Sequence, residues 1–279
     1  MTVLITGSRG KVATTLIPLL RERGLAVRAA SASPDKLTLP SGVDRVVCDL
    51  DDPATFPAAL AGAESVFLYA NPKHIEAFLA EAKAAGVQHI VLLSSSSVLQ
   101  PDADTNAIAA MHRAVERTLE ASGIQSTFLQ PGAFSGNALG WSWSIKSTST
   151  VDLPYPGAQA SPIHEADIAE AALAVLTTPE LRGRAYHLTG PASLSATEQV
   201  EILAEASGRP LTVNPVTGEA WKQSVAEFMP PGVADALLSY FAASEGRPDA
   251  VTTAVEELTG HPARTFASWA RENVDAFRP

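Results

Sequence analysis

Small residues spaced for phosphate binding follow the first apolar run of the chain, in LITGSRGKVAT. Gly7 permits a tight turn, Gly10 lets backbone N–H groups approach a pyrophosphate, and Ala13 allows a helix to pack closely on a strand. A strand, a glycine turn and a helix start in this order form the context that a dinucleotide-binding turn requires. We therefore expect this turn to contact a dinucleotide through Gly7, Ser8, Arg9, Gly10, Lys11 and Val12.

The segment after the second apolar run lacks an acidic residue. A site that prefers NAD usually has a carboxylate there, about 20 residues after the turn, on the ribose 2′-hydroxyl. Here AVRAASASPDK ends its apolar part with Ser31, Ala32 and Ser33. Ser31, Ser33 and Arg9 offer hydrogen bonds to a 2′-phosphate, although a solvated surface role for Arg9 is the alternative. The pattern predicts NADPH as cofactor, with NADH bound more weakly.

A helix with one group that titrates near neutral pH is predicted over residues 107–123, AIAAMHRAVERTLEASG. Strong helix formers dominate it, and apolar residues recur at spacings of three and four from Ile108 to Leu119. Gly123 is a stop signal. His112 is the side chain here that titrates most easily near neutrality. The helix is therefore either catalytic without an ordinary acid, or a packing helix.

Apolar runs alternate with helical patterns over the first half of the chain, which predicts β-α-β units and a doubly wound parallel sheet. The runs are fully apolar, as in a sheet covered on both faces. The predicted strands are residues 2–6, 26–31, 45–50, 65–70, 89–95, 126–131 and 184–190.

The pattern changes after residue 136, where Ser, Gly, Pro and aromatic residues predict loops with short strands, and after residue 192, where helices dominate. We therefore predict a dinucleotide-binding domain over 1–135, to which 161–191 return. A smaller, mostly helical substrate-binding lobe takes 136–160 and 192–279. Trp141, Trp143 and Trp221 suit a flat aromatic ligand, with ordinary packing as the alternative.

Composition excludes several functional classes. The net charge of −10 argues against a nucleic-acid partner. No run approaches the ~18 apolar residues of a membrane span, and the start of the chain lacks a signal-peptide pattern. No His, Cys, Asp and Glu set has metal-ligand spacing, and the lone Cys48 predicts a buried, inert thiol. We expect a cytoplasmic protein without a membrane partner, as a monomer or weak dimer.

Several stretches together resemble the NmrA-like group of atypical short-chain dehydrogenases/reductases, which implies a Rossmann sheet. They run from end to end: TGSRGKVA, CDLDD, HIVLLSSSSV, GIQSTFLQPGAFSGN, SPIHEADIAEAAL, YHLTGPASLSATEQVEILAEASGRPL and TGHPARTFASWARENVDAF. The resemblance implies adenine and ribose contacts from Asp49, Leu50, Tyr69, Ala70 and Asn71. It implies nicotinamide contacts from Pro131, Gly132, Ala133 and Phe134, with Asn137 beyond them towards the substrate.

The chain departs from the superfamily on the helix at 107–123. Ordinary members carry Tyr-x-x-x-Lys there, where Tyr gives a proton to the forming alkoxide and Lys holds the ribose. In this chain Ile108 occupies the position of the tyrosine and His112 that of the lysine. By the superfamily's strand-end pattern, Ser95 is the best match for the catalytic serine that polarises a carbonyl. Ser96 is the second candidate and is otherwise expected beside the substrate. The alternative is that these serines end a strand and contact only cofactor. His112 then touches the ribose, relays a proton or fills the helix surface.

The favoured function is an NADPH-dependent ketoreductase acting on a small aromatic ketone. A substrate with a hydroxyl beside its ketone can supply the missing proton, because a phenol has a pKa near ~10. The overall pattern is similar to ketoreductases that tailor aromatic polyketides of the angucyclinone type in antibiotic biosynthesis. The alternatives are a quinone reductase and a non-catalytic NADP(H) sensor that binds a regulatory partner.

Overall fold

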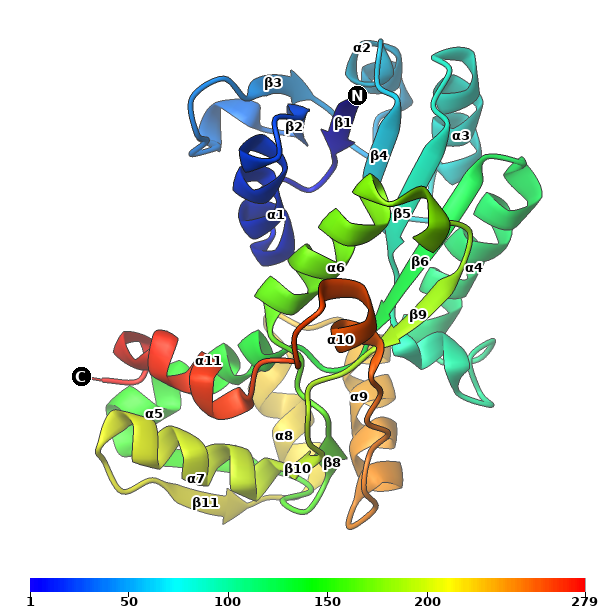
Figure 1. The fold of residues 1–279 in the computed structure, drawn as a ribbon. Helices are drawn as coiled ribbons and strands as arrows, with labels where there is room; N and C mark the ends of the chain where they lie inside the picture. The colour runs from blue at the N-terminus through cyan, green and yellow to red at the C-terminus, as the bar shows by residue number, and fades with distance from the viewer. Residues whose placement is uncertain (279) are drawn as a thin grey trace.

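The computed structural model describes residues 1–278, and its centre is a seven-stranded parallel sheet with strand order β3-β2-β1-β4-β5-β6-β9 (Figure 1). This order confirms the predicted doubly wound α/β fold. The strands are β1 (Thr2–Ile5), β2 (Ala26–Ser31), β3 (Asp44–Val47), β4 (Ser65–Tyr69), β5 (His89–Leu93), β6 (Gln125–Pro131) and β9 (Ala185–Leu188).

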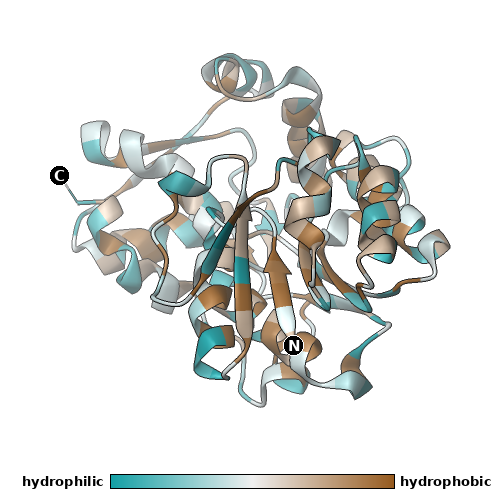
Figure 2. Cartoon of the chain, turned by 90° about the horizontal axis from the view of Figure 1, so that it is seen from above, coloured by the Kyte–Doolittle hydropathy of each residue, from teal (hydrophilic) through white to brown (hydrophobic). Residues whose placement is uncertain are grey.

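Helices cover both faces of the sheet, which explains its fully apolar strands. In β1, Val3 and Ile5 belong to one core while Leu4, pointing the other way, belongs to a second. Figure 2 shows hydrophobic residues dominating the central strands. One face carries α1 (Lys11–Glu22) and α6 (Glu165–Thr177), and the other carries α2 (Phe56–Leu60), α3 (Ile75–Ala84) and α4 (Ala107–Ser122).

Local signals fix the ends of α4, the helix that the sequence predicts over 107–123. The Asn106 side chain accepts hydrogen bonds from the backbone N–H groups of Ile108 and Ala109 at 3.0 and 3.1 Å. Gly123 ends the helix with φ of +76°, a conformation that glycine adopts without strain. The predicted helix and its stop signal are confirmed.

The remaining elements form a second, largely helical region with a core of its own, drawn in the lower part of Figure 1. They are α5 (Ser142–Thr148), β7 (Thr150–Leu153), β8 (Gln159–Ala160), β10 (Leu194–Ser195), α7 (Ala196–Ser207), β11 (Thr212–Pro215), α8 (Gly218–Val225), α9 (Pro231–Ser244) and α11 (Phe266–Glu272); α10 (Ala254–Thr259) is the exception and packs against α6. Short 3₁₀ segments lie at Pro34–Lys36, Pro53–Thr55, Ser96–Leu99, Ser135–Trp141, Pro179–Leu181 and Val274–Ala276.

Two features of this region differ from the sequence-based expectation. Residues 142–148, expected as loop, form α5, because Ile145 is fully buried in the core of the lobe. α10 was placed in the lobe, yet its Val255 and Leu258 pack into the core on the α1 and α6 face of the sheet. The predicted division at residue 192 therefore misplaces α10. None of the helices within residues 1–278 combines the length and the apolar character of a bilayer-crossing segment.

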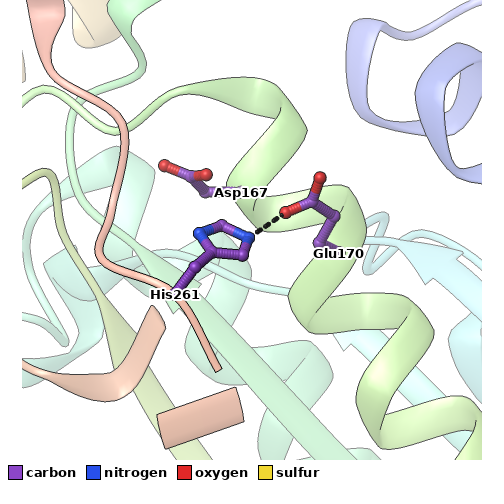
Figure 3. Close-up of side chains that lie close together, drawn as sticks. All are labelled: Asp167, Glu170 and His261. Carbon is purple, nitrogen blue, oxygen red and sulfur yellow. Dashed lines mark hydrogen bonds and ion pairs between the residues drawn. The ribbon is translucent and has the colours of Figure 1, made fainter. Parts of the chain in front are cut away.

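An ion-pair cluster ties the segment before α11 to α6 (Figure 3). Asp167 is fully buried, and its carboxylate accepts hydrogen bonds from the backbone N–H and the guanidinium of Arg264. Glu170 accepts from Arg264 at 2.7 Å and bonds to the His261 ring at 2.6 Å. Asp167, Glu170 and His261 are close enough together to ligate a metal, but the Arg264 guanidinium already supplies the positive charge between both carboxylates.

We predict that Arg264→Ala lowers the free energy of unfolding by about 3–5 kcal/mol, because it leaves the Asp167 carboxylate buried without its partner. Denaturant unfolding followed by circular dichroism measures this loss. Arg271→Ala, which removes an exposed arginine from α11, is the matched control and costs less than about 0.5 kcal/mol. Equal losses for the two variants would contradict the prediction.

Candidate active site

The glycine turn is fixed to the end of β2 by the side chain of Ser8. Its hydroxyl donates to the Ile5 carbonyl at 2.8 Å and accepts from the Ala30 backbone N–H at 3.0 Å. Gly7 has φ of +57°, in the left-handed region that favours glycine. The buried Ser8 side chain therefore shapes the turn, and only the backbone of this residue remains for the predicted cofactor contact.

The N-terminus of α1 offers backbone N–H groups without a side-chain partner. Its N-cap residue is Gly10, which makes no side-chain hydrogen bond, whereas Asn106 caps α4 and His164 caps α6. The first N–H groups of a helix need acceptors, and a phosphate satisfies both these groups and the helix dipole. Lys11 is exposed at this end, while Val12 is buried below it. The turn thus fits a pyrophosphate.

Tyr69 lies across the glycine turn from the end of β4. An added Cβ at Gly7 would lie 2.8 Å from the Tyr69 ring, and one at Gly10 would collide with its hydroxyl. Burial raises the pKa of Tyr69 to about 12, an effect that the backbone N–H of Ala13 partly offsets. The phenol is therefore neutral, and its oxygen lies where α1 presents its free N–H groups. The ring therefore covers the glycine turn in this structure.

The end of β2 is suited to a 2′-phosphate. The Ser31 hydroxyl accepts from the Ser33 N–H at 3.1 Å, which leaves its own proton free to donate. Arg9 is exposed and follows Ser8, which binds Ala30 next to Ser31. The Ser31 hydroxyl thus lies at the strand end where an NAD-preferring site has a carboxylate, and a contact of the Arg9 guanidinium with a 2′-phosphate stays a prediction.

The loops after β3 and β4 are joined on the predicted adenine side. The Asp49 side chain accepts from the Asp51 N–H at 3.0 Å, and the Asn71 amide donates to Asp51 at 3.2 Å. Leu50 and Ala70 are half-buried and pack on the adjacent core. The structure thus brings the adenine residues implied by the family resemblance to one edge of the sheet; their contact with cofactor stays a prediction.

A cavity of about 280 Å³ lies at the carboxyl ends of the central strands. Phe134 forms a bridge with Ile163, and Gly132 donates its N–H to Leu188 at 3.0 Å, so the predicted nicotinamide segment is held against β9 and the start of α6. Ala133 binds Ile163 through its carbonyl. The lining residues are Tyr69, Ala70, Leu93, Ser94, Ser95, His112, Pro131, Gly132 and Phe134.

Ser95 is oriented to donate a hydrogen bond. Its oxygen accepts from the backbone N–H of Ser97 at 3.2 Å and from the Ser97 hydroxyl at 2.9 Å. Its own proton has no acceptor among these contacts, so it is free for a carbonyl in the cavity. Ser94 is arranged the other way, because its hydroxyl donates to Glu116 at 2.6 Å. The geometry therefore favours Ser95 as the residue that polarises a carbonyl.

His112 faces the cavity as an acceptor. Its Nδ1 lies 2.9 Å from the carbonyl of Ile108, which can only accept, so Nδ1 carries the proton and Nε2 carries the lone pair. Burial lowers the pKa of His112, although the Ile108 carbonyl and Glu116 oppose this shift. A neutral imidazole at physiological pH suits a ribose hydroxyl, and it has no spare proton for an alkoxide.

The predicted substrate residues are less concentrated than the cofactor residues. Ser96 lies close to Gly132, with its oxygen 3.8 Å from the position of an added Cβ. Asn137 is exposed, and Trp143 is 79% exposed. Trp141 packs on the lobe core and Trp221 packs edge-to-face on Phe241. None of these tryptophans lines the cavity, whose aromatic residues are Tyr69 and Phe134; their contact with a substrate stays a prediction.

Sequence reasoning missed Ser94, Glu116 and Gln130, which form one buried network beside the cavity. The Glu116 carboxyl accepts from Ser94 and, at 2.9 Å, from the Gln130 amide. The spacing of four from Ile108 to His112 to Glu116 on one helix was a usable signal, because it stacks the three side chains on one face. His164 has a structural role, because its Nδ1 accepts from the Ala166 N–H to cap α6 and its Nε2 bonds to Glu272.

Comparison with known proteins agrees with this geometry, since residues 7–179 match the NAD(P)H-binding family. The chain belongs to that family. It is 36% identical, over 99% of both chains, to a (4-alkanoyl-5-oxo-2,5-dihydrofuran-3-yl)methyl phosphate reductase of Streptomyces griseus. It is 33% identical, again over 99% of both, to an NAD(P)H azoreductase of Xenophilus azovorans.

Among solved structures, an NADPH-dependent quinone oxidoreductase from Escherichia coli superimposes with a TM-score of 0.81, at 27% identity over 97% of this chain and 98% of the other. Family and relatives together confirm the NmrA-like, atypical short-chain resemblance. The protein is an NAD(P)H-dependent oxidoreductase, and its preference for NADPH over NADH stays a prediction. These findings favour the enzyme over the non-catalytic sensor.

We predict that Arg9→Ala weakens NADPH binding by about 10–100-fold, since one or more charge-assisted hydrogen bonds to the 2′-phosphate are lost. NADH, which lacks this phosphate, binds within about twofold of its original affinity. Titration by cofactor fluorescence measures both constants. Arg23→Ala, at the exposed far end of α1, is the control. A parallel loss of NADH affinity would contradict the assignment of Arg9.

We predict that Ser95→Ala lowers kcat by about 10²-fold, because the carbonyl loses its hydrogen-bond donor. His112→Ala lowers kcat by less than about 10-fold, because only a neutral hydrogen bond to the ribose is removed. Steady-state rates of NADPH oxidation with one acceptor decide the order. A larger loss for His112→Ala than for Ser95→Ala would show that the imidazole takes part in the chemistry.

Proposed function

We propose that this enzyme reduces small conjugated carbonyl acceptors, such as quinones, enones and aromatic ketones, with hydride from NADPH. The observation that carries the proposal is the cavity itself. It joins the predicted nicotinamide segment, a serine with a free proton and the face of α4, which has an apolar Ile108 in place of an acid. Acceptors that delocalise the incoming charge depend least on a strong protein acid.

The activities by which the relatives are named support this class of acceptor. A dihydrofuranone with an alkanoyl group, an azo compound and a quinone each take electrons into a conjugated, electron-poor system. The ring of Phe134 and the half-buried Tyr69 border the cavity and suit a flat ligand. An aromatic polyketide ketone of the angucyclinone type is one member of this class and stays the finer prediction.

Each part of the chain has a distinct task in this reaction. NADPH supplies the hydride when bound. The free N–H groups of α1 hold the pyrophosphate, and Arg9 with Ser31 holds the 2′-phosphate. Ser95 donates to the carbonyl oxygen as negative charge develops there, and Nε2 of His112 accepts a ribose hydroxyl. Tyr69, which borders both the glycine turn and the cavity, moves away from the turn as cofactor binds.

We expect NADPH oxidation with menadione, a conjugated enone and 2′-hydroxyacetophenone, and a kcat/KM at least about 10²-fold lower with a saturated aliphatic ketone, which needs a strong acid. Absorbance of NADPH in the presence of each acceptor measures the rates. Tight NADPH binding without turnover of any acceptor would contradict the proposal and favour the redox sensor.

A further inference from the structure

A buried carboxyl group lies directly behind the cavity and has no role in the reaction described so far. Glu116 is 8% exposed, and one oxygen, Oε1, receives both of its hydrogen bonds. The donors are the neutral Ser94 hydroxyl at 2.6 Å and the Gln130 amide at 2.9 Å. No cation within residues 1–278 forms an ion pair with it. A carboxyl bonded to a hydroxyl can hold a proton and pass it along that bond.

The fold places Ser94 between this carboxyl and the cavity. Ser94 follows β5, donates its backbone N–H to Leu129 on β6 at 2.8 Å, and lines the cavity beside Ser95. Glu116 lies one helical turn beyond His112 on the same face of α4. When the carboxyl is protonated, its O–H donates to the Ser94 oxygen, and the Ser94 proton is released to point into the cavity.

A reduction of a ketone consumes one proton for each hydride. Tyr69 also lines the cavity, but its hydroxyl lies over the glycine turn beside the Ala13 N–H, and burial raises its pKa to about 12. Ile108 carries no acidic proton, and the Nδ1–H of His112 is committed to a backbone carbonyl. The Ser95 hydroxyl can donate a hydrogen bond, but losing its proton would leave an alkoxide with no base beside it among its contacts.

We propose that Glu116 supplies the proton consumed in carbonyl reduction and delivers it through the hydroxyl of Ser94. The carbonyl carbon accepts hydride from NADPH, its π bond breaks, and the electron pair moves to oxygen. That oxygen takes the Ser94 proton while Ser94 takes the Glu116 proton. The carboxylate then regains a proton from water after the alcohol leaves. The inference rests on the proposed reductase function and replaces the substrate hydroxyl as proton source.

The other titratable and charged groups around α4 do not offer this proton. His112 is the titratable neighbour on α4 itself, and its pKa is lowered by burial. On the helices packed against α4, Glu76 and Lys83 of α3 and Asp235 of α9 are exposed, and Glu81 of α3 is half-buried. Arg113 on α4 is bonded to the Val98 carbonyl and to Asp104.

The test compares Glu116→Gln with the original enzyme on three acceptors: 2′-hydroxyacetophenone, its methyl ether and menadione. The amide oxygen of Gln keeps both hydrogen bonds but has no proton to give. We expect kcat for both acetophenones to fall by about 10²–10⁴-fold, with KM within about threefold. Menadione reduction falls far less, because a hydroquinone anion needs no proton from the protein.

A double variant tests whether the two groups act in series. Ser94→Ala alone matches the ketone loss of Glu116→Gln, and the combination loses no more than either single change. Glu120→Gln, the same substitution on the exposed face of α4, leaves all three rates unchanged. Circular dichroism and NADPH affinity report whether each variant is folded with an intact cofactor site.

Three results would overturn the inference. Equal losses on menadione and on the ketones would assign Glu116 a purely structural role, and undiminished ketone reduction would remove it from the reaction. An original enzyme that reduces 2′-hydroxyacetophenone far faster than its methyl ether would return proton supply to the substrate. NADPH binding without turnover of any of the three acceptors would overturn the proposed function itself, and this inference with it.

Discussion

The unsatisfied N–H groups at the start of α1 are the constraint on which the site depends. Gly10 offers them no side chain, so an acceptor must come from elsewhere. In this structure the Tyr69 hydroxyl approaches them, and a pyrophosphate meets the same need with more charge. The same ring belongs to the wall of the cavity, so the glycine turn and the cavity share one side chain.

The face of α4 then decides which chemistry follows hydride transfer. At three successive turns it presents the apolar Ile108, the imidazole of His112 and the buried carboxyl of Glu116. Ordinary members of the superfamily have a tyrosine and a lysine at the first two of these positions. Because His112 gives its Nδ1 proton to the backbone, its role is to receive a hydrogen bond. The acidic group is set one layer deeper, behind Ser94, where water does not reach it directly.

Packing of the C-terminal segment keeps the two regions of the chain together. Arg264 neutralises the buried Asp167 and Glu170 on α6, and α10 fills the same core through Val255 and Leu258. The start of α6 in turn holds the segment from Pro131 to Phe134 through Ile163. The cavity wall is therefore supported by contacts made more than a hundred residues further along the chain.

Local sequence patterns determined the sheet, the glycine turn, the missing acid after β2 and the ends of α4, because each depends on neighbours within a few residues. They also predicted NADPH and an oxidoreductase. Only the tertiary structure decided which residues face the cavity: it placed Trp143 in solvent, moved α10 to the sheet core and joined Ser94, Glu116 and Gln130. These three come from separate elements, and no local pattern records the strand pairing and helix packing that bring their polar atoms within hydrogen-bond distance.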